Sequence, residues 1–434
     1  MSDKTFHNQE DFENSVKFAK SLDANDPLKD FRERFLIPSI NGKEQIYFLG
    51  NSLGLQSKNI KEEINKILDE WARFGVEGFF TGEERWVDYH DQLTQTLSKI
   101  IGAKPNEISV MNQLTVNLHL MMVSFYRPVN KRNKIICEVK AFPSDQYMFE
   151  THIRYRGLNP DEVLIEVPPR KGEYLIRHED ILNAIDKHHD EIALVLFSGI
   201  NYYTGQVFDI RAITDAAHAI GAIAGFDLAH AAGNISLQLH DWNVDFACWC
   251  SYKYLNSGPG AMGGVFINEK FHREKKIKRF GGWWGYDKDT RFKMEKGFKP
   301  IPTAEGWQLS TPSILLYAAH KAALQIFEEA GWETLQAKQR SLNNYLWFVL
   351  DELNSHSRQE VIEYITPKNK DQVSCQVSML MLKQGKEVFE ELGRQGVMVD
   401  WREPDVIRIA PVPLYNTFEE VWRFGNLIGS ILNQ

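Results

Sequence analysis

The middle of the chain alternates short apolar runs with amphipathic segments. Between two of the apolar runs, the segment 209–221 places its aliphatic residues on one helical face and ends at Gly221, as a helix with a glycine C-terminus does. Runs that are apolar at successive positions are typical of strands buried on both faces of a sheet. This alternation predicts βαβ units, and therefore an α/β fold with a mostly parallel, doubly wound central sheet flanked by helices. The predicted strands cover 134–139, 162–167, 192–199, 222–229, 245–251 and 264–267.

The pattern changes near residue 312. Two long helical segments, 313–331 and 334–354, are followed by an alternating run at 372–381 and by two short apolar runs. Thr417 and Glu420 then have the spacing of a capping box before an amphipathic helix. We therefore expect three parts: an N-terminal segment, 1–60, that packs with the small domain, a large α/β domain over 61–311, and a smaller C-terminal α+β domain over 312–434.

Composition narrows the class of protein. The 434 residues include 50 Lys and Arg against 58 Asp and Glu, a net charge of −8. A mildly acidic chain without a long basic run argues against nucleic acid or an anionic membrane as a partner. The N-terminal residues lack the plan of a signal peptide, and no run approaches the roughly 18 apolar residues of a membrane span. The four cysteines form no C-x-x-C pair, so we expect buried, reduced thiols and a cytoplasmic location.

The segment 251–264, SYKYLNSGPGAMGG, permits two interpretations. Its three glycines match the G-x-G-x-x-G turn of dinucleotide-binding proteins, which needs a strand before it and a helix after it. Here the residues after the glycines, 265–267, have the composition of a strand instead. Lys253 would then lie just beyond a strand end, where it can act as a catalytic amine. A solvated lysine beside a glycine turn is the alternative.

Other polar residues follow predicted strands or begin helices. If Lys253 forms a Schiff base with a cofactor, the cofactor's ring nitrogen needs a carboxylate, and Asp227 at the end of the preceding strand is suitably placed. Asp227 could equally cap the following turn, and His230 could fill a polar niche. Leu114 and Thr115 begin an apolar helical run, which suits a phosphate, although Thr115 alone resembles an ordinary N-cap.

A further signal indicates a different enzyme class. Residues 50–54 read G-x-S-x-G after an apolar segment, the context of the nucleophile elbow of a serine hydrolase, with Ser52 as nucleophile. Only one plausible strand precedes Ser52, and no late histidine completes the expected order of the triad. No spaced set of histidines and cysteines supports a metal site, so we expect none.

A family resemblance rests on the motifs FLGNSLGLQ, QLTVNLHL, FPSDQY, NYYTGQ, FDLAHAAGN, DWNVDFACWCSYKYLNSG, GWWGY, TRFKM and RIAPVPLYNT. Together these motifs resemble those of the kynureninases. The resemblance runs from about Tyr47 to the C-terminal helix and is most specific from FDLAH to SYKYLN. It implies a pyridoxal 5'-phosphate enzyme of the aspartate-aminotransferase fold type, a homodimer with its site near the subunit interface. It also implies a small-molecule substrate: hydrolysis of L-kynurenine to anthranilate and L-alanine, and of 3-hydroxykynurenine likewise.

The same resemblance assigns residues to roles. Lys253 would carry the cofactor, and Asp227 would face its ring nitrogen. Tyr252 would contact the cofactor phosphate and donate a proton in later steps. Arg408 would hold the substrate carboxylate, since its planar fork grips both oxygens, while Ser52 and Phe79 would line the substrate pocket. Phe79 stands where animal kynureninases present a histidine toward the substrate ring, and it could also simply pack near Trp71 and Trp86. The remaining cofactor contacts would be Leu114, Thr115, Phe142, Asp145, Ser198, His230, Trp283 and Thr311.

The sequence leaves two alternative functions open. One is another enzyme of the same fold type, a cysteine desulfurase or an aminotransferase. A desulfurase needs a mobile nucleophilic cysteine, whereas all four cysteines lie in strand-like runs. The other is a cofactor-binding protein that has lost catalysis, against which the presence of both Lys253 and Arg408 argues.

Overall fold

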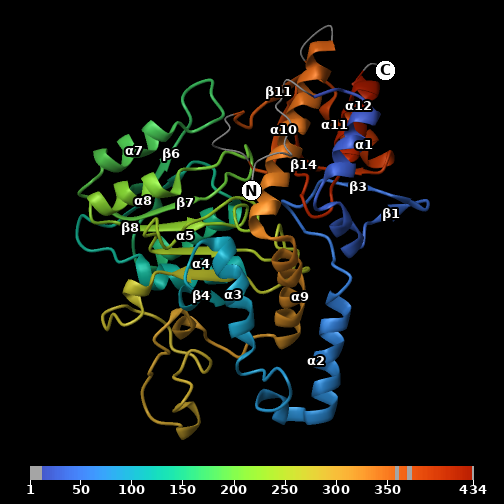
Figure 1. The fold of residues 1–434 in the computed structure, drawn as a ribbon. Coiled ribbons are helices and arrows are strands. Elements are labelled where there is room, and N and C mark those ends of the chain that lie inside the picture. The colour runs from blue at the N-terminus through green and yellow to red at the C-terminus, as the bar shows by residue number, and fades with distance from the viewer. Residues whose placement is uncertain (1–11, 357–360, 369–373, 433–434) are drawn as a thin grey trace. The chain divides into compact units, whose positions relative to one another are not determined.

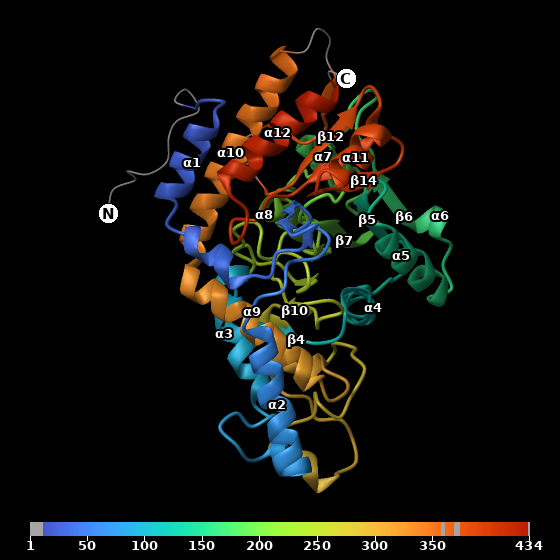
Figure 2. The same ribbon diagram turned by 90° about the vertical axis from the view of Figure 1, so that its right-hand side faces the viewer.

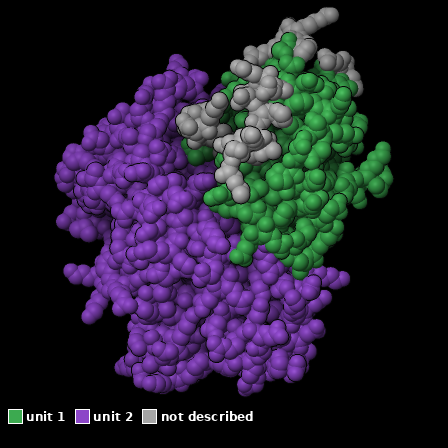
Figure 3. All heavy atoms as spheres, viewed as in Figure 1, with its two compact units in different colours: residues 1–59, 203–207, 326–434 green, residues 60–202, 208–325 purple. Residues whose placement is uncertain are grey.

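The chain forms two compact units. The computed structural model describes residues 12–356, 361–368 and 374–432. Unit 1 groups the N-terminal part up to residue 59 with 203–207 and 326–434, and unit 2 comprises 60–202 and 208–325 (Figure 3). The expectation about a signal peptide rests largely on residues 1–11, which lie outside the described part of the chain. Within the described part, no helix is long and apolar enough to cross a membrane.

Unit 2 is built around a seven-stranded sheet of described residues. Its strand order is β4-β10-β9-β8-β7-β5-β6, and β6, β5, β7, β8 and β9 run parallel. The strand β10 runs antiparallel to both of its neighbours. The bounds are β4 Ile108–Val110, β5 Lys134–Glu138, β6 Leu164–Val167, β7 Ile192–Ser198, β8 Ile223–Asp227, β9 Phe246–Trp249 and β10 Gly264–Ile267.

Helices cover both faces of this sheet. The pair α4 and α5 lies on one side and the pair α7 and α8 on the other, as the ribbon shows from two directions (Figures 1 and 2). The α4 helix contributes buried side chains that pack with those of β5, β9 and β10 in one apolar core. The helices of unit 2 are α2 Ile60–Phe74, α3 Tyr89–Ile101, α4 Leu114–Phe125, α5 Pro143–Tyr155, α6 Pro160–Val163, α7 His178–Lys187 and α8 Ile210–Ala219.

The predicted α/β architecture is confirmed, with two differences of detail. The strand predicted from residue 162 begins at Leu164, because Pro160 starts a short helix, α6, that ends at Val163. The last predicted strand, β10, is antiparallel. Its connection from β9 contains no helix, and a parallel strand needs a crossover connection, usually helical.

Unit 1 contains a four-stranded antiparallel sheet in the order β11-β12-β15-β14. Buried side chains of β12 and β15 pack with those of α10 and α12. The strands of this sheet are β11 Ile362–Tyr364, β12 Val377–Met381, β14 Asp400–Arg402 and β15 Val406–Ile409. In the described part of unit 1, two short strand pairs lie outside this sheet. In one, β1 Ser39–Ile40 pairs with β2 Lys43–Glu44, and in the other, β3 Ile46–Tyr47 pairs with β13 Val397–Met398. The helices are α1 Val16–Asn25, α10 Trp332–His356, α11 Gly385–Arg394 and α12 Phe418–Leu432.

The predicted capping box at the start of α12 is present. The hydroxyl of Thr417 accepts the N–H of Glu420 at 3.1 Å, and the Glu420 carboxylate accepts the N–H of Thr417 at 3.1 Å. Asp23, near the end of α1, accepts two more N–H groups of the same helix start. Satisfying these otherwise unpaired donors fixes where α12 begins and ties α1 to it.

The division between the units falls inside α9, Ile314–Ala330, and not at the expected residue 312. The first half of α9 belongs to unit 2 because its side chains bond there. The Tyr317 hydroxyl donates to the carbonyl of Val110, and the His320 ring pairs with the Ser257 hydroxyl. A change of sequence texture marks where a helix begins, but it does not reveal which core the helix packs against.

Candidate active site

The carboxyl ends of the parallel strands of unit 2 bring the candidate residues together. Glu138 ends β5, Ser198 ends β7 and Asp227 ends β8, and Lys253 follows β9. Ser198 and Asp227 are direct neighbours in the sheet. Ligands of open α/β sheets bind outside these ends. This edge of the sheet is therefore the candidate site.

Lys253 is held in a buried polar environment. Its side chain is only 9% exposed, and its Nζ lies 3.0 Å from Nε2 of His230. The same nitrogen lies 5.8 Å from the centre of the Phe142 ring, which in turn packs edge-on against Tyr202. Lys253 is therefore not the solvated surface lysine of the alternative interpretation. It is an amine placed between an imidazole and an aromatic ring.

The glycines after Lys253 serve a tight return loop. Gly258 and Gly260 have φ angles of +92° and +69°, a region that glycine adopts readily. A Cβ on Gly263 would lie 2.6 Å from the carbonyl oxygen of Trp249. The loop leads directly into β10, so the dinucleotide-binding interpretation is wrong: no helix follows the glycines to receive a pyrophosphate.

The same loop holds the start of α4. The N–H of Gly263 donates to the carbonyl of Asn112, and the Gln113 side chain donates to the carbonyl of Gly260. Gln113 is the N-cap residue and makes no side-chain cap, so Thr115 is a helical residue and not the N-cap. The first-turn amides of Leu114 and Thr115 thus belong to a helix N-terminus that no side chain caps, an arrangement that suits a phosphate.

The site also contains three buried carboxyl groups that lie near one another, those of Glu138, Asp145 and Asp227. Both oxygens of Glu138 accept the N–H of Ser198, at 3.1 and 3.2 Å. Asp227 accepts the N–H of Ala229 at 2.8 Å, so it does cap the following turn, and its carboxyl group lies next to that of Asp145. Burial raises the pKa of Glu138 to about 7 and raises that of Asp227. Burial and the neighbouring Asp227 raise the pKa of Asp145 well above its ordinary value. A cationic ring N–H would relieve this accumulation of negative charge.

Tyr252 packs against the apolar core of unit 2, to which Cys137, Cys248 and Cys250 belong, whereas Cys375 lies in unit 1. Tyr252 is half-buried. Burial is the largest cause of the raised pKa of its hydroxyl, and the nearby Cys250 raises that pKa further. The tyrosine is therefore protonated at neutral pH and able to donate. All four cysteines are buried and none forms a disulfide. Burial raises the pKa of each thiol, which makes these cysteines poor nucleophiles.

Two predicted cofactor contacts lie on the surface of unit 2. Trp283 is 41% exposed and packs edge-on against Phe292, and Thr311 is exposed. Phe79 is half-buried and packs against Trp86 at 5.2 Å and Trp284 at 6.0 Å between ring centres. The contact with Trp86 is one that we expected if Phe79 only packs, whereas the second neighbour is Trp284 and not Trp71. Its role in substrate choice stays a prediction.

Ser52 and Arg408 belong to unit 1. Ser52 is exposed in a turn after β3, and the next helix, α2, begins only at Ile60. The strand–serine–helix geometry of a nucleophile elbow is therefore absent, and the serine-hydrolase interpretation is wrong on this ground. Arg408, in β15, is 1% exposed. Because β15 lies between β12 and β14, Arg408 is not a surface residue of an edge strand.

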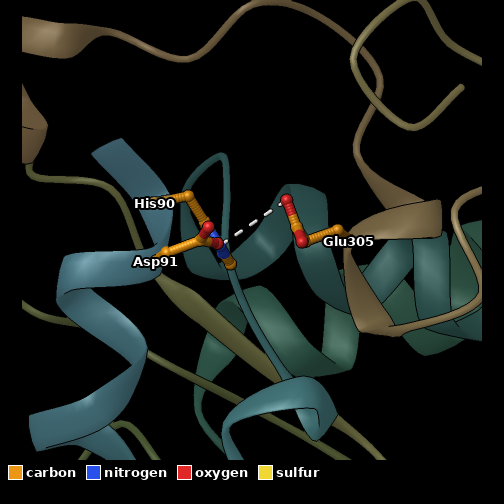
Figure 4. Close-up of side chains that lie close together, drawn as sticks. All are labelled: His90, Asp91 and Glu305. Atoms are coloured by element: carbon orange, nitrogen blue, oxygen red, sulfur yellow. Dashed lines mark ion pairs between the residues drawn. The ribbon is translucent and has the colours of Figure 1, made fainter. Parts of the chain in front are cut away.

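One further cluster of acidic and histidine side chains occurs in the described part of unit 2 (Figure 4). His90 and Asp91 at the start of α3 face Glu305, with the His90 Nδ1 3.8 and 3.7 Å from the two carboxylates. The His90 Nε2 accepts the N–H of Val110, so in the neutral ring the proton is on Nδ1, which faces the acids. The ammonium of Lys288 lies 3.1 Å from Glu305. With a proton on the facing nitrogen and an ammonium already pairing the acids, this donor set does not favour a metal ion.

Sequence reasoning missed two residues of the site. Glu138 joins the carboxyl group cluster, and Tyr202 packs against Phe142. A signal for Glu138 existed, because a lone acid lies near the end of an apolar run, as Asp227 does. Tyr202 lies in the NYYTGQ motif, but the resemblance assigned no role to it.

Comparison with known proteins identifies the fold first. The structure matches the apo cysteine desulfurase of Thermococcus onnurineus with a TM-score of 0.74, covering 93% of this chain and 98% of that one at 19% identity. It matches a C-DES mutant carrying glycine covalently linked to its PLP cofactor with a TM-score of 0.75, covering 92% and 98% at 17% identity. The fold is thus that of the pyridoxal-phosphate enzymes of fold type I, as the sequence predicted.

The sequence comparisons identify the family. The model of the kynureninase C-terminal domain matches residues 335–428. The kynureninase of Flavobacterium psychrophilum is 51% identical over 417 residues, which is 96% of this chain and 98% of its own length. That of Myxococcus xanthus is 49% identical over 414 residues, covering 95% and 96%. The chain belongs to the kynureninase family.

Proposed function

We propose that the chain is a pyridoxal-phosphate-dependent kynureninase that hydrolyses the Cβ–Cγ bond of L-kynurenine to release anthranilate and L-alanine. It would accept 3-hydroxykynurenine as well, and serve tryptophan breakdown or the synthesis of NAD precursors. The observation that carries the proposal is the arrangement of Lys253, His230 and Phe142 beside the buried acid Asp227, in a chain about half identical to kynureninases over nearly its whole length.

The described residues fit the proposed cofactor. The uncapped start of α4 suits its phosphate, the Phe142 ring suits its aromatic face, and the crowded carboxyl groups around Asp227 suit a protonated ring nitrogen. When bound, pyridoxal phosphate supplies an electron sink for carbanions formed at the substrate's α- and β-carbons.

The protein's own groups would then move protons and orient the substrate. Lys253, once its nitrogen is released, takes the proton from the substrate Cα through Nζ. His230, 3.0 Å from that nitrogen, orients it. Tyr252 keeps its proton at neutral pH, because nothing lowers its pKa below the ordinary value of a tyrosine, and so it can donate that proton when the Cβ–Cγ bond breaks. Asp227 holds the proton of the ring nitrogen.

One assay tests the proposal. Purified protein supplied with pyridoxal phosphate and L-kynurenine should release anthranilate, which is followed by its fluorescence. A protein that releases sulfide from cysteine but no anthranilate would instead be a desulfurase. Release of neither would favour a cofactor-binding protein without catalysis. The four buried thiols, each with a raised pKa, argue against the desulfurase.

Replacing Arg408 with alanine should impair substrate binding. Truncating one partner of a buried charge pair costs about 2 to 5 kcal/mol, so catalytic efficiency with kynurenine should fall by roughly tens to thousands of fold. The cofactor should still bind, because its proposed contacts lie in unit 2. Steady-state kinetics and cofactor absorbance measure the two properties separately. A loss confined to cofactor affinity would contradict the assignment of Arg408.

Replacing Phe79 with histidine should shift substrate choice. A phenylalanine offers a substrate hydroxyl only apolar contact, and an apolar pocket discriminates by roughly a hundredfold at most. We therefore expect the natural protein to prefer kynurenine modestly over 3-hydroxykynurenine, and Phe79→His to favour the hydroxylated substrate. Kinetics with both substrates decide the matter: a natural preference for 3-hydroxykynurenine would remove Phe79 from this role.

We also infer a homodimer in the cytoplasm. Trp283, Phe292 and Phe80 form a connected group of exposed aromatic rings in unit 2, and such groups often mark protein interfaces. Trp283 and Thr311 are assigned to the cofactor yet exposed, which supports a site completed at a subunit interface. A sedimentation-equilibrium mass equal to that of one chain would contradict the dimer. The buried free thiols support a reducing compartment.

A further inference from the structure

Arg408 belongs to a polar row that crosses the sheet of unit 1. In the register of the sheet, Arg408 of β15 lies opposite Ser378 of β12 on one side and Asp400 of β14 on the other. Directly opposite residues share a face of the sheet. The neighbours of Arg408 along the strand, Ile407 and Ile409, belong to the apolar core of unit 1. Because successive side chains of a strand alternate, Arg408 points to the other face.

Asp400 fixes the guanidinium group on that face. Its Oδ2 accepts the Nε–H of Arg408 at 2.5 Å and also contacts Nη2 of the same group. Asp400 is itself mostly buried, with 17% of its side chain exposed, whereas Arg408 is 1% exposed. A second arginine, Arg402, donates its Nε–H to the same oxygen at 3.0 Å from a more exposed position.

Stability alone does not account for this arrangement. A buried ion pair gains little over well-packed apolar residues, because both charges lose their hydration. A guanidinium held at two of its nitrogens, however, loses its freedom to rotate, and a pre-oriented group binds its ligand without a further entropic cost. The pair therefore suits a binding role.

We propose that Asp400 is a positioning residue that orients Arg408 toward the carboxylate of the amino-acid substrate. The proposal rests on the proposed function, because Arg408 receives its ligand there. Asp400 does not touch the substrate. It acts through the arginine, in the way that outer groups orient the ligands of a metal site, where their loss costs about 10- to 100-fold in metal affinity or activity.

Kinetics of Asp400→Asn test the proposal. The KM for kynurenine should rise by about 10- to 100-fold, while kcat at saturating substrate changes much less, because the reacting groups are not affected. Asp400→Glu, which keeps the charge, should recover part of the loss. The matched control is Asp351→Asn, which removes a carboxylate from an exposed ion pair with Lys368 in the same unit and should leave KM unchanged. A fall in kcat with KM unchanged would overturn the proposal.

A double-mutant cycle separates positioning from a general structural effect. In an Arg408→Gln background, Asp400→Asn should change the KM by no more than about twofold, since the group it orients is gone. Binding supplies a readout apart from turnover: the natural protein should bind L-alanine more tightly than L-alaninamide, followed through cofactor absorbance, and Asp400→Asn should lose that preference. If the single variant does not fold, the Asp400→Glu variant and the Arg408→Gln pair decide by the same criteria.

The outcomes distinguish the two proposals. If the natural protein releases no anthranilate, the proposed function fails. If it releases anthranilate normally but Asp400→Asn retains both its KM and its preference for L-alanine, only the positioning role of Asp400 fails. Equal losses of affinity with and without Arg408 would also overturn that role, because Asp400 would then act on something else.

Discussion

Lys253→Ala is expected to lower kcat for anthranilate release by about 10⁴-fold or more, because it removes both the covalent attachment of the cofactor and the base that takes the Cα proton. The nitrogen it removes is buried and lies 3.0 Å from His230. Borohydride reduction of the natural protein should fix the cofactor on Lys253, as peptide mapping would show, and the variant should retain none after the same treatment.

A matched lysine controls for the loss of charge. Lys131 lies on the surface of the same unit, in an exposed ion pair with Asp190. Lys131→Ala should therefore keep full activity and the same borohydride labelling. Mapping of the reduced cofactor to any lysine other than Lys253 would show that the site has been assigned wrongly.

Asp227→Ala is expected to lower kcat by about 100- to 1,000-fold while some cofactor stays bound and attached to Lys253. Without a carboxylate beside it, the ring nitrogen loses its proton, and the neutral ring withdraws electrons poorly. Single-turnover absorbance with kynurenine measures the loss of catalysis, and the amount of cofactor that borohydride can reduce measures how much stays attached to Lys253. Normal turnover in this variant would exclude the proposed role of Asp227.

The same substitution should destabilise the cofactor-free protein less than the removal of a buried acid with charged partners does. Burial raises the pKa of Asp227 in the folded chain, so the charged form opposes folding, and stability falls as pH rises above the pKa of the unfolded aspartate. Removing the group relieves that opposition at neutral pH. Asp245 gives the contrast: it is equally buried but paired with Lys270 and His218, so Asp245→Ala should lower the melting temperature. A larger loss for Asp227→Ala than for Asp245→Ala would contradict this account.

The fold followed from the sequence to a large extent because its signals are local. Runs of apolar residues and the helix between them predicted β5 to β10 and α8, and the capping box at Thr417 predicted where α12 begins. Each of these depends on residues a few positions apart. The antiparallel direction of β10 and the attachment of the first half of α9 to unit 2 depend on contacts between distant segments, which leave no local sign in the sequence.

The features of the site also divide into those that the sequence predicted and those that only the tertiary structure decided. By itself the sequence determined the residue types: a lysine after a buried strand, an acid at the end of the strand before it, and motifs that match one family over most of the chain. Only the tertiary structure decided which of them meet. It brought His230 to Lys253, added Glu138 to the acids around Asp227, and joined Asp400 to Arg408 across neighbouring strands. The reason is physical: the charge and orientation of a buried polar group depend on the partners that folding supplies and on the water it removes, and neither is encoded at any single position.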